Sequence, residues 1–315
     1  MNSLILWMTD NYKLLDHASV GTLTVNELFE TGQTTLASKD KKTIHRFLEI
    51  GHFTIVNKLI YKEGKVDEWF SLLHELILQS NFNVYALLKQ RAERYGDKSL
   101  FQTISANNIA PTSYVNVWKT VQSIGSYFQE NLGENDTIGL LSPNHLNGII
   151  LDLACLAYHI RIVPIPMNLS SDHLNYVLDH AEITHLFIGS DRARESLKDA
   201  KRSPSEFNAV QIDNKEEWNG LFTKCRQSII INPPTKNLQS LATVMYTSGT
   251  TDNPKGIIFN QENIITKRFA RALALPEISS NDSFLCYLPL YHTFGRWFEM
   301  MGSIFWGATY TFTQS

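Results

Sequence analysis

The chain has 315 residues, of which 43% are hydrophobic and 19% charged, as is usual for a globular protein. Its 28 basic and 31 acidic residues leave a net charge of −3, which gives no reason to expect a nucleic-acid partner or an anionic membrane surface. The three cysteines, Cys155, Cys225 and Cys286, show no metal-binding spacing and no even-numbered disulfide framework, so we expect a reducing, cytoplasmic location. No stretch reaches the roughly 18 apolar residues of a membrane span. Peripheral membrane contact and the oligomeric state stay open.

The first 81 residues have a helical pattern. Residues 41–64 and 65–80 carry apolar side chains at three-and-four spacing, which predicts amphipathic helices separated at Gly64. The short apolar patch at residues 4–8 has no basic region before it and no cleavage site after it, so we expect no secretory signal. Residues 1–81 are therefore predicted to form a helical N-terminal extension without a catalytic constellation.

From residue 82 onward, helical patterns alternate with short apolar strands. The pattern predicts a helix that ends at Gly96, a hairpin turned at Asn107–Asn108 and a helix that stops at Gly133. Further strands are predicted at 137–142, 161–168, 184–190, 207–213, 241–248, 255–260, 283–290 and 308–313. Further helices are predicted at 145–160, 171–181, 191–200, near 215–223, and at 261–275 and 291–307. This alternation predicts an α/β fold with mostly parallel, doubly wound sheets flanked by helices over residues 82–315.

The loop YTSGTTDNPKG, residues 246–256, interrupts this pattern with residues that cannot build a core. Gly249 and Gly256 permit close backbone approach to a ligand, and Lys255 supplies a flexible positive charge after the stiffening Pro254. Consecutive backbone N–H groups in such a loop can bind an anion. Hydroxyl groups come from Thr247, Ser248, Thr250 and Thr251. The composition therefore favours a cradle for phosphate groups over a plain polar turn.

The loop differs from the common GxxxxGK[ST] phosphate loop. Gly249 and Lys255 have its spacing, but Pro254 stands at the second glycine and Gly256 stands at the magnesium-binding hydroxyl. A strand is predicted to follow it, so the helix N-terminus that such loops use is missing. The loop is therefore either a phosphate loop of another kind or no phosphate loop.

The same stretch resembles the signature YTSGTTGxPKG of the AMP-forming adenylation family, which includes acyl-CoA synthetases, luciferases and peptide-synthetase adenylation domains. Ten of the eleven positions fit, counting the free one. Asp252 departs from the usual glycine or serine, either as a turn-former with its carboxylate in solvent or as a charge that weakens ATP binding. Residues 112–168, with a strand that ends before Pro-Asn, resemble the N-terminal subdomain of that family. LPLYHTFG, residues 288–295, resembles the LPLxHxF form of long-chain fatty acyl-CoA synthetases.

The resemblance implies roles for residues outside the loop. It places His292 beside the acyl site and the path of the thiol, against the alternative of a packed histidine. Tyr291, Phe294 and Trp297 fit an acyl pocket or a helix core equally well. For Arg296 we favour a surface position over contact with a carboxylate.

Two histidines invite a metal hypothesis. His173 and His180 lie on one face of a predicted helix, near Asp172 and Asp179. A solvated helix face explains this spacing better, so no metal site is predicted.

The resemblance implies a two-step ligase reaction. A small carboxylic acid, expected to be a fatty acid, would attack Mg²⁺-bound ATP to give acyl-AMP and pyrophosphate. Coenzyme A would then displace AMP. Thr247, Ser248, Gly249, Thr250, Thr251, Lys255 and Gly256 are expected to bind the triphosphate, and Lys255 and His292 to act in catalysis.

Three interpretations of the chain stay open at this point. Residues 293–315 contain none of the family's later motifs, so we expect an N-terminal part of such a synthetase, inactive or nearly so alone. The second interpretation is a truncated, non-catalytic protein that binds a nucleotide or a partner. The third is an acyl-AMP ligase that loads a carrier protein.

Overall fold

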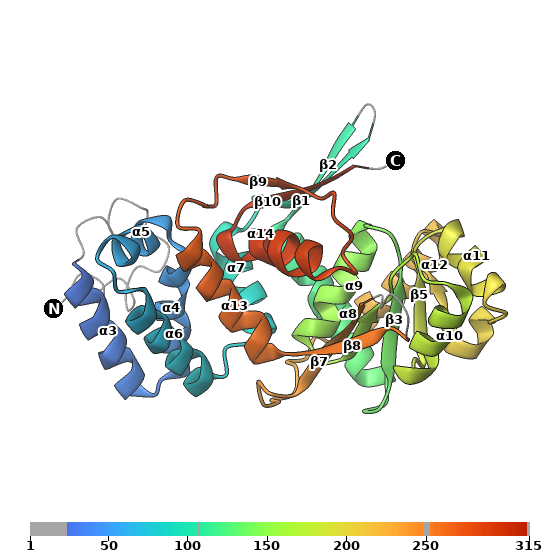
Figure 1. Ribbon diagram of the computed structural model, residues 1–315, viewed down its shortest axis with the longest axis horizontal. Coiled ribbons are helices and arrows are strands. Elements are labelled where there is room, and N and C mark those ends of the chain that lie inside the picture. Colours follow the sequence, from blue (N-terminus) through green and yellow to red (C-terminus); the bar gives the residue numbers. More distant parts are fainter. Residues whose placement is uncertain (1–23, 106–107, 248–252, 314–315) are drawn as a thin grey trace.

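The computed structural model describes residues 24–105, 108–247 and 253–313. The N-terminal helices lie at one end of the molecule and the helices of residues 171–227 at the other, with two β-sheets between them (Figure 1). The fold is α/β with mostly parallel strands, as the sequence predicts. The arrangement brings Thr247 and Lys255, which flank residues 248–252 in the chain, opposite each other in the larger sheet.

The N-terminal segment forms a bundle of short helices. They are α3 (Val25–Ser38), α4 (Lys41–Glu49), the 3₁₀ turn η1 (Ile50–His52), α5 (Thr54–Lys62) and α6 (Val66–Ser80). Gly64 separates α5 from α6 with φ +65°, a conformation that favours glycine. The expected helix over 41–64 is interrupted by the turn Ile50–His52 and the extended Phe53. Phe269 packs closely here, since a Cβ on Gly51 would lie 2.6 Å from one of its ring carbons. The break lets the segment approach the domain that follows.

The larger sheet has six strands in the order β6-β5-β3-β4-β7-β8, parallel except for β8. They are β3 (Thr137–Leu141), β4 (Arg161–Pro164), β5 (His185–Ile188), β6 (Val210–Gln211), β7 (Leu241–Thr247) and β8 (Lys255–Asn260). Ile162 and Val163 belong to separate buried clusters, as successive residues of a strand that is covered on both faces should. Helix α8 (Tyr114–Asn131) precedes β3. The helices between the strands are α9 (Leu146–Ala157), α10 (Ser171–His180), α11 (Asp191–Asp199), η2 (Pro204–Phe207) and α12 (Lys215–Gln227).

The smaller sheet joins distant parts of the chain in the order β2-β1-β10-β9. Its strands are β1 (Ser99–Ser105), β2 (Asn108–Ser113), β9 (Ser283–Leu285) and β10 (Thr309–Thr313), with β1 and β2 forming the predicted hairpin. Its flanking elements are α7 (Val84–Tyr95), α13 (Gln261–Ala274), the π-helical η3 (Phe294–Met300) and α14 (Met301–Trp306). The predicted strand 283–290 ends early, at Leu285, and the backbone N–H of Cys286 makes the last bond to β10, at the Thr311 carbonyl. The predicted helix 291–307 begins as a π-helix.

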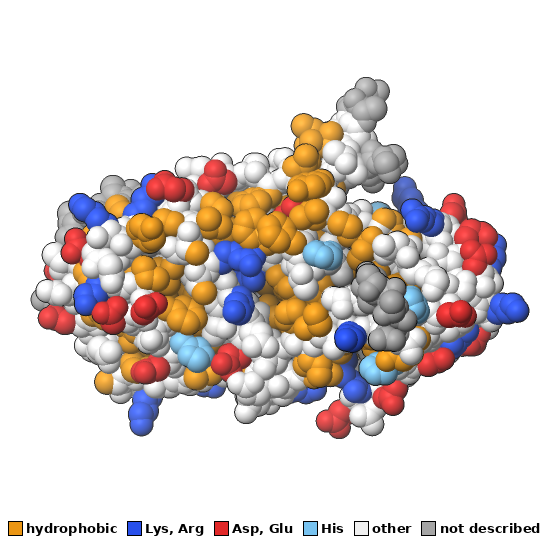
Figure 2. All heavy atoms as spheres, viewed as in Figure 1, with side chains coloured by type: hydrophobic (Ala, Val, Ile, Leu, Met, Phe, Trp, Pro, Cys, Tyr) orange, Lys and Arg blue, Asp and Glu red, His pale blue; other side chains and the backbone are white. Residues whose placement is uncertain are grey.

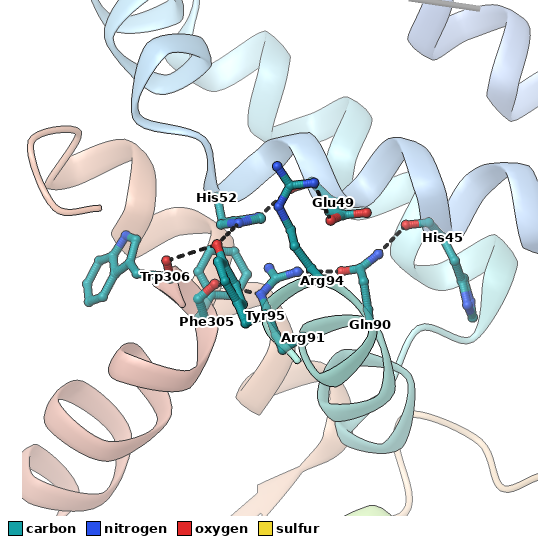
Figure 3. A network of polar contacts seen from close by, with 9 residues as sticks. All are labelled: His45, Glu49, His52, Gln90, Arg91, Arg94, Tyr95, Phe305 and Trp306. Atoms are coloured by element: carbon teal, nitrogen blue, oxygen red, sulfur yellow. Dashed lines mark hydrogen bonds and ion pairs between the residues drawn. The ribbon is translucent and has the colours of Figure 1, made fainter. Parts of the chain in front are cut away.

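The N-terminal segment and the α/β part share one buried cluster and a polar network (Figure 3). Arg94 of α7 forms an ion pair with Glu49 of α4, with 3.1 Å between nitrogen and oxygen. Tyr95 and His52 share a hydrogen bond of 2.7 Å, and Arg91 donates to a backbone carbonyl of α14. Helices α5 and α6 also pack on α13. The boundary predicted near residue 81 thus crosses a continuous interior, and its status as a domain boundary stays a prediction.

Candidate functional site

The polar loop leaves the sheet between two paired strands. Thr247 is the last described residue of β7 and lies opposite Lys255, the first residue of β8. The Thr247 hydroxyl lies 3.5 Å from the Lys255 carbonyl oxygen, to which it donates. The predicted site residues Ser248, Gly249, Thr250 and Thr251, like Asp252, lie outside the described residues. The structure thus places both ends of the loop together at the carboxyl end of β7, where open α/β sheets bind ligands.

Gly256 lets the two strands pack closely. It lies opposite Tyr246, and a Cβ at this position would lie 2.9 Å from a methyl carbon of Val244. The Tyr246 hydroxyl in turn shares a 2.7 Å hydrogen bond with Nδ1 of His180 on α10. The end of β7 is therefore fixed to a neighbouring helix, which gives the loop a rigid base.

Lys255 has the properties of an anion-binding cation. Its side chain is exposed, and it forms no ion pair with another described residue. Buried Pro254 precedes it and restricts the backbone. A lysine with no counter-ion among the described residues, at the end of a hairpin, is placed to neutralise a phosphate group.

His292 lies on a separate segment. Its side chain is exposed, and its Nδ1 accepts a 3.3 Å hydrogen bond from the backbone N–H of Phe294 at the start of η3. The side chain of Asn144, just after β3, holds the preceding segment by bonds to Leu288 and Leu290 of 2.8 and 2.9 Å. No hydrogen bond joins His292 to Lys255 in the described part of the chain. Asn144 is thus a positioning residue whose only signal in the sequence is its place after a strand.

The surface position favoured for Arg296 is wrong. The residue is fully buried, and its guanidinium forms a two-bond ion pair with Asp152 of α9, with Nε to Oδ2 at 2.9 Å. It also donates to the hydroxyl of Thr243 in β7 at 2.9 Å. Its partner is 144 residues away along the chain, so sequence spacing gave no sign of the pair.

The aromatic side chains near His292 have different environments. Trp297 is buried and its ring centroid lies 5.2 Å from that of Phe259, whereas Phe294 is 49% exposed. Tyr291 and His145 line a cavity of about 20 Å³ beside β3 and α9, room for about one water. This cavity is too small for an acyl chain, so the acyl-pocket role of Tyr291 stays a prediction.

The histidines of α10 have contacts other than a metal. His180 bonds to Tyr246, and Asp179 forms an ion pair with Arg202 at 2.9 Å. Within residues 24–105, 108–247 and 253–313, no group of three or more His, Cys, Asp or Glu side chains is placed to hold a metal ion. The three cysteines are buried and unpaired.

The comparisons with known proteins identify the family. The sequence profile described as AMP-binding enzyme matches residues 88–315. The chain belongs to the AMP-binding enzyme family. The matched residues include the loop, both strands that carry it and the segment of His292.

Sequence relatives of this AMP-binding chain are plant synthetases. It is 29% identical over 209 residues to Long chain acyl-CoA synthetase 3 of Arabidopsis thaliana, covering 59% of this chain and 31% of that protein. It is 28% identical over 249 residues to Long chain acyl-CoA synthetase 5 of the same plant, covering 70% and 37%. The chain therefore spans about a third of the length of these relatives.

Solved structures share the fold. VinN superposes with a TM-score of 0.63 at 17% identity, covering 73% of this chain and 56% of VinN. The o-succinylbenzoate CoA synthetase MenE from Bacillus subtilis, solved with an acyl-adenylate, superposes with a TM-score of 0.58 at 20% identity, covering 72% and 43%. At such identities the likeness of the AMP-binding chain to these proteins concerns the fold.

In the part of the chain that the structure describes, no helix has the length and apolar character needed to cross a membrane.

Proposed function

We propose that this chain carries the triphosphate-binding part of an AMP-forming acyl-CoA synthetase that activates a carboxylic acid, with a fatty acid as the preferred class. The observation that carries the proposal is the paired end of β7 and β8, where Thr247 and Lys255, which has no ion-pair partner among the described residues, flank the loop. Membership of the AMP-binding family and relatives named long-chain acyl-CoA synthetases support it. The acid would attack the α-phosphorus of ATP, giving acyl-AMP and pyrophosphate, and the thiol of coenzyme A would displace AMP.

The loop would act by holding negative charge. As the bond between the α- and β-phosphates breaks, charge grows on the leaving pyrophosphate, and fixed donors aimed at that charge lower the barrier. Lys255 would neutralise it, and Thr247, Ser248, Thr250 and Thr251 would donate hydrogen bonds. Gly249 and Gly256 would allow the backbone to approach. His292 is proposed to line the acyl and thiol path.

The proposed cosubstrates are ATP, Mg²⁺ and coenzyme A, and each rests on a different observation. An exposed lysine without an ion-pair partner among the described residues suits ATP phosphates. Because the described residues offer no carboxylate and histidine cluster, Mg²⁺ is proposed to enter already bound to ATP. Coenzyme A as acceptor rests on the names of the plant relatives, and a carrier protein is the alternative acceptor.

The test is Lys255→Ala in the native protein, read as acid-dependent exchange between ATP and pyrophosphate. We expect the exchange rate to fall by about 10²-fold, because one preorganised donor to the developing charge is lost. Lys224→Ala on α12 removes an exposed lysine remote from the loop and should leave the rate unchanged. An unaltered rate for Lys255→Ala would remove this residue from the proposed machinery.

Two further measurements separate the alternatives. Acids of different chain length, offered with coenzyme A, identify the substrate class and the acceptor in the native protein. Nucleotide binding without any exchange would instead support a non-catalytic relative. With the 315 residues alone we expect weak or absent exchange, since they span about a third of the relatives' length.

A further inference from the structure

A groove lies between β8, α13 and η3. It has a volume of about 360 Å³, within the range of small-molecule sites. Its lining residues within the described part of the chain are Ile258, Phe259, Asn263, Ile264, Lys267, Arg268, Arg271, Thr293, Phe294 and Trp297. Figure 2 shows basic side chains over the middle of α13, with hydrophobic side chains beside them. The groove thus combines positive charge with an apolar wall.

Arg268 is buried at this groove without a polar partner in the part of the chain that the structure describes. Its side chain is 3% exposed, and its Nε and Nη1 atoms have no hydrogen-bond acceptor among the described residues. Burial, and then repulsion from Arg271, lowers the pKa of Arg268 to about 9. A buried guanidinium normally has an acidic partner, as Arg296 has in Asp152. The groove therefore carries a buried positive charge that no described acidic side chain offsets.

Arg271 supplies a second guanidinium one turn further along α13. Its Nη1 is also buried without an acceptor, while its guanidinium carbon lies 4.7 Å from the centroid of the Phe298 ring. Lys267 is exposed at the groove edge. Three cations and no acidic side chain line the groove within the described residues.

These donors suit a phosphate better than a carboxylate. Three buried guanidinium nitrogens lack acceptors, two on Arg268 and one on Arg271. A phosphate monoester offers three strong acceptor oxygens and nearly two negative charges, whereas a carboxylate offers two oxygens and one charge. Guanidinium groups bind phosphate oxygens through paired N–H bonds. The number of unmet donors and the net charge thus favour a phosphate monoester.

The other wall of the groove indicates what carries the phosphate. Ile258 is 65% exposed and Phe294 is 49% exposed, next to the buried Trp297. An inorganic ion on Arg268 would leave these side chains in water. A ligand with an apolar body attached to the phosphate would cover them.

We propose that the groove between β8, α13 and η3 binds a phosphate monoester with an apolar body, the phosphate on Arg268 and Arg271 and the body on Phe294 and Trp297. The site differs from the triphosphate loop. Ile258 is three residues beyond Lys255 on β8, about 10 Å along the strand, and no described residue of the loop lines the groove. The proposal does not depend on adenylation activity.

The experiment measures calorimetric binding of monomeric dodecyl phosphate to the full-length protein. Arg268→Met is expected to weaken binding by about 10- to 100-fold, the loss for charge-assisted hydrogen bonds. The thermal midpoint of Arg268→Met should equal or exceed that of the parent, since an unpaired buried charge is removed. Arg271→Met, at a partly exposed position, should also weaken binding. It provides a second test of the site if Arg268→Met does not fold. Arg192→Met on α11 makes the same charge change at an exposed site and should bind like the parent.

Two comparisons complete the test. Phe294→Ala should weaken dodecyl phosphate but leave inorganic phosphate unchanged, and dodecanoate should bind more weakly than dodecyl phosphate. If the protein sediments with phosphatidylcholine vesicles that contain phosphatidic acid, and Arg268→Met does not, the phosphate belongs to a lipid headgroup. If dodecyl phosphate binds but the protein does not sediment with the vesicles, the phosphate belongs to a soluble ester. The proposal would be overturned if neither dodecyl phosphate nor the vesicles bound, or if Arg268→Met did not weaken binding. It would also be overturned if dodecanoate bound as tightly as dodecyl phosphate.

Discussion

Buried arginines in this molecule differ in a way that only their neighbours reveal. Arg296 is fully buried and satisfied by Asp152 and Thr243, whereas Arg268 is nearly as buried and has no acceptor among the described residues. A paired guanidinium ties elements together, here η3, α9 and β7. An unpaired one is a cost that a ligand can offset. The first is therefore structural and the second a candidate for binding.

The first of these roles predicts a large effect on stability. Asp152→Asn leaves the Arg296 guanidinium buried with a weaker partner, so the free energy of unfolding should fall by about 3 kcal/mol. Urea unfolding followed by circular dichroism measures this change. Asp97→Asn removes the charge of an exposed aspartate and should change stability by no more than about 0.5 kcal/mol. Equal values for the two variants would show that the ion pair does not hold these elements together.

At the scale of elements, short connections fix how helices join the strands of the larger sheet. The connection from α9 to β4 contains His159, which is 6% exposed and has φ +57°. Its Nε2 lies 3.4 Å from the side-chain nitrogen of Asn83, the N-cap of α7. Burial, and then the charge of Lys236, lowers the pKa of His159 to about 4 from the ordinary 6.5. The connection thus depends on a neutral imidazole.

This environment predicts how stability depends on pH. Because the unfolded chain binds a proton on His159 at higher pH than the folded chain, its stabilisation is present above pH 6.5 and is lost as pH falls towards 4. The loss from this residue is about 3 kcal/mol. His159→Asn keeps a residue that tolerates positive φ and should flatten this part of the profile. Urea midpoints between pH 7.5 and 4.5 test it, and parallel profiles for variant and parent would speak against it.

At the scale of the whole molecule, the N-terminal helices belong to the same interior as the α/β part. Phe269 packs against Gly51 and Phe82, and Phe305 lies against His52. A single buried cluster runs from Leu28 through both parts to β10. The extension therefore covers α13 and α14, the helices next to the proposed groove and the smaller sheet.

This packing predicts that residues 82–315 do not fold stably alone. Removing the extension uncovers Phe82, Phe269 and Phe305, at about 1.5–3 kcal/mol for each side chain, a total comparable to the stability of a whole domain. Circular dichroism of 82–315 beside 24–315 should show a cooperative transition only in the longer chain. A shorter chain that melts cooperatively near the temperature of the longer one would make the extension a separate domain.

Local patterns in the sequence were sufficient for the order and type of most elements, but not for α3 or for the break between α4 and α5. The helical spacing, the strand alternation and the helix end at Gly64 are patterns of neighbouring residues. The family signature around Lys255 consists of eleven consecutive residues. The predicted helices and strands recur in the structure because secondary structure is set largely by neighbouring residues. The expected roles of Lys255 and His292 stay predictions.

Tertiary structure alone decided which distant residues meet. The sequence did not show that β10 would pair with β1, that Asp152 would bury Arg296, or that Arg268 would face a groove without an acceptor. The reason is physical. The strand pairing and the ion pair depend on contacts between residues more than 100 positions apart, and the groove depends on how three elements pack, and neither leaves a periodic signal in a single chain.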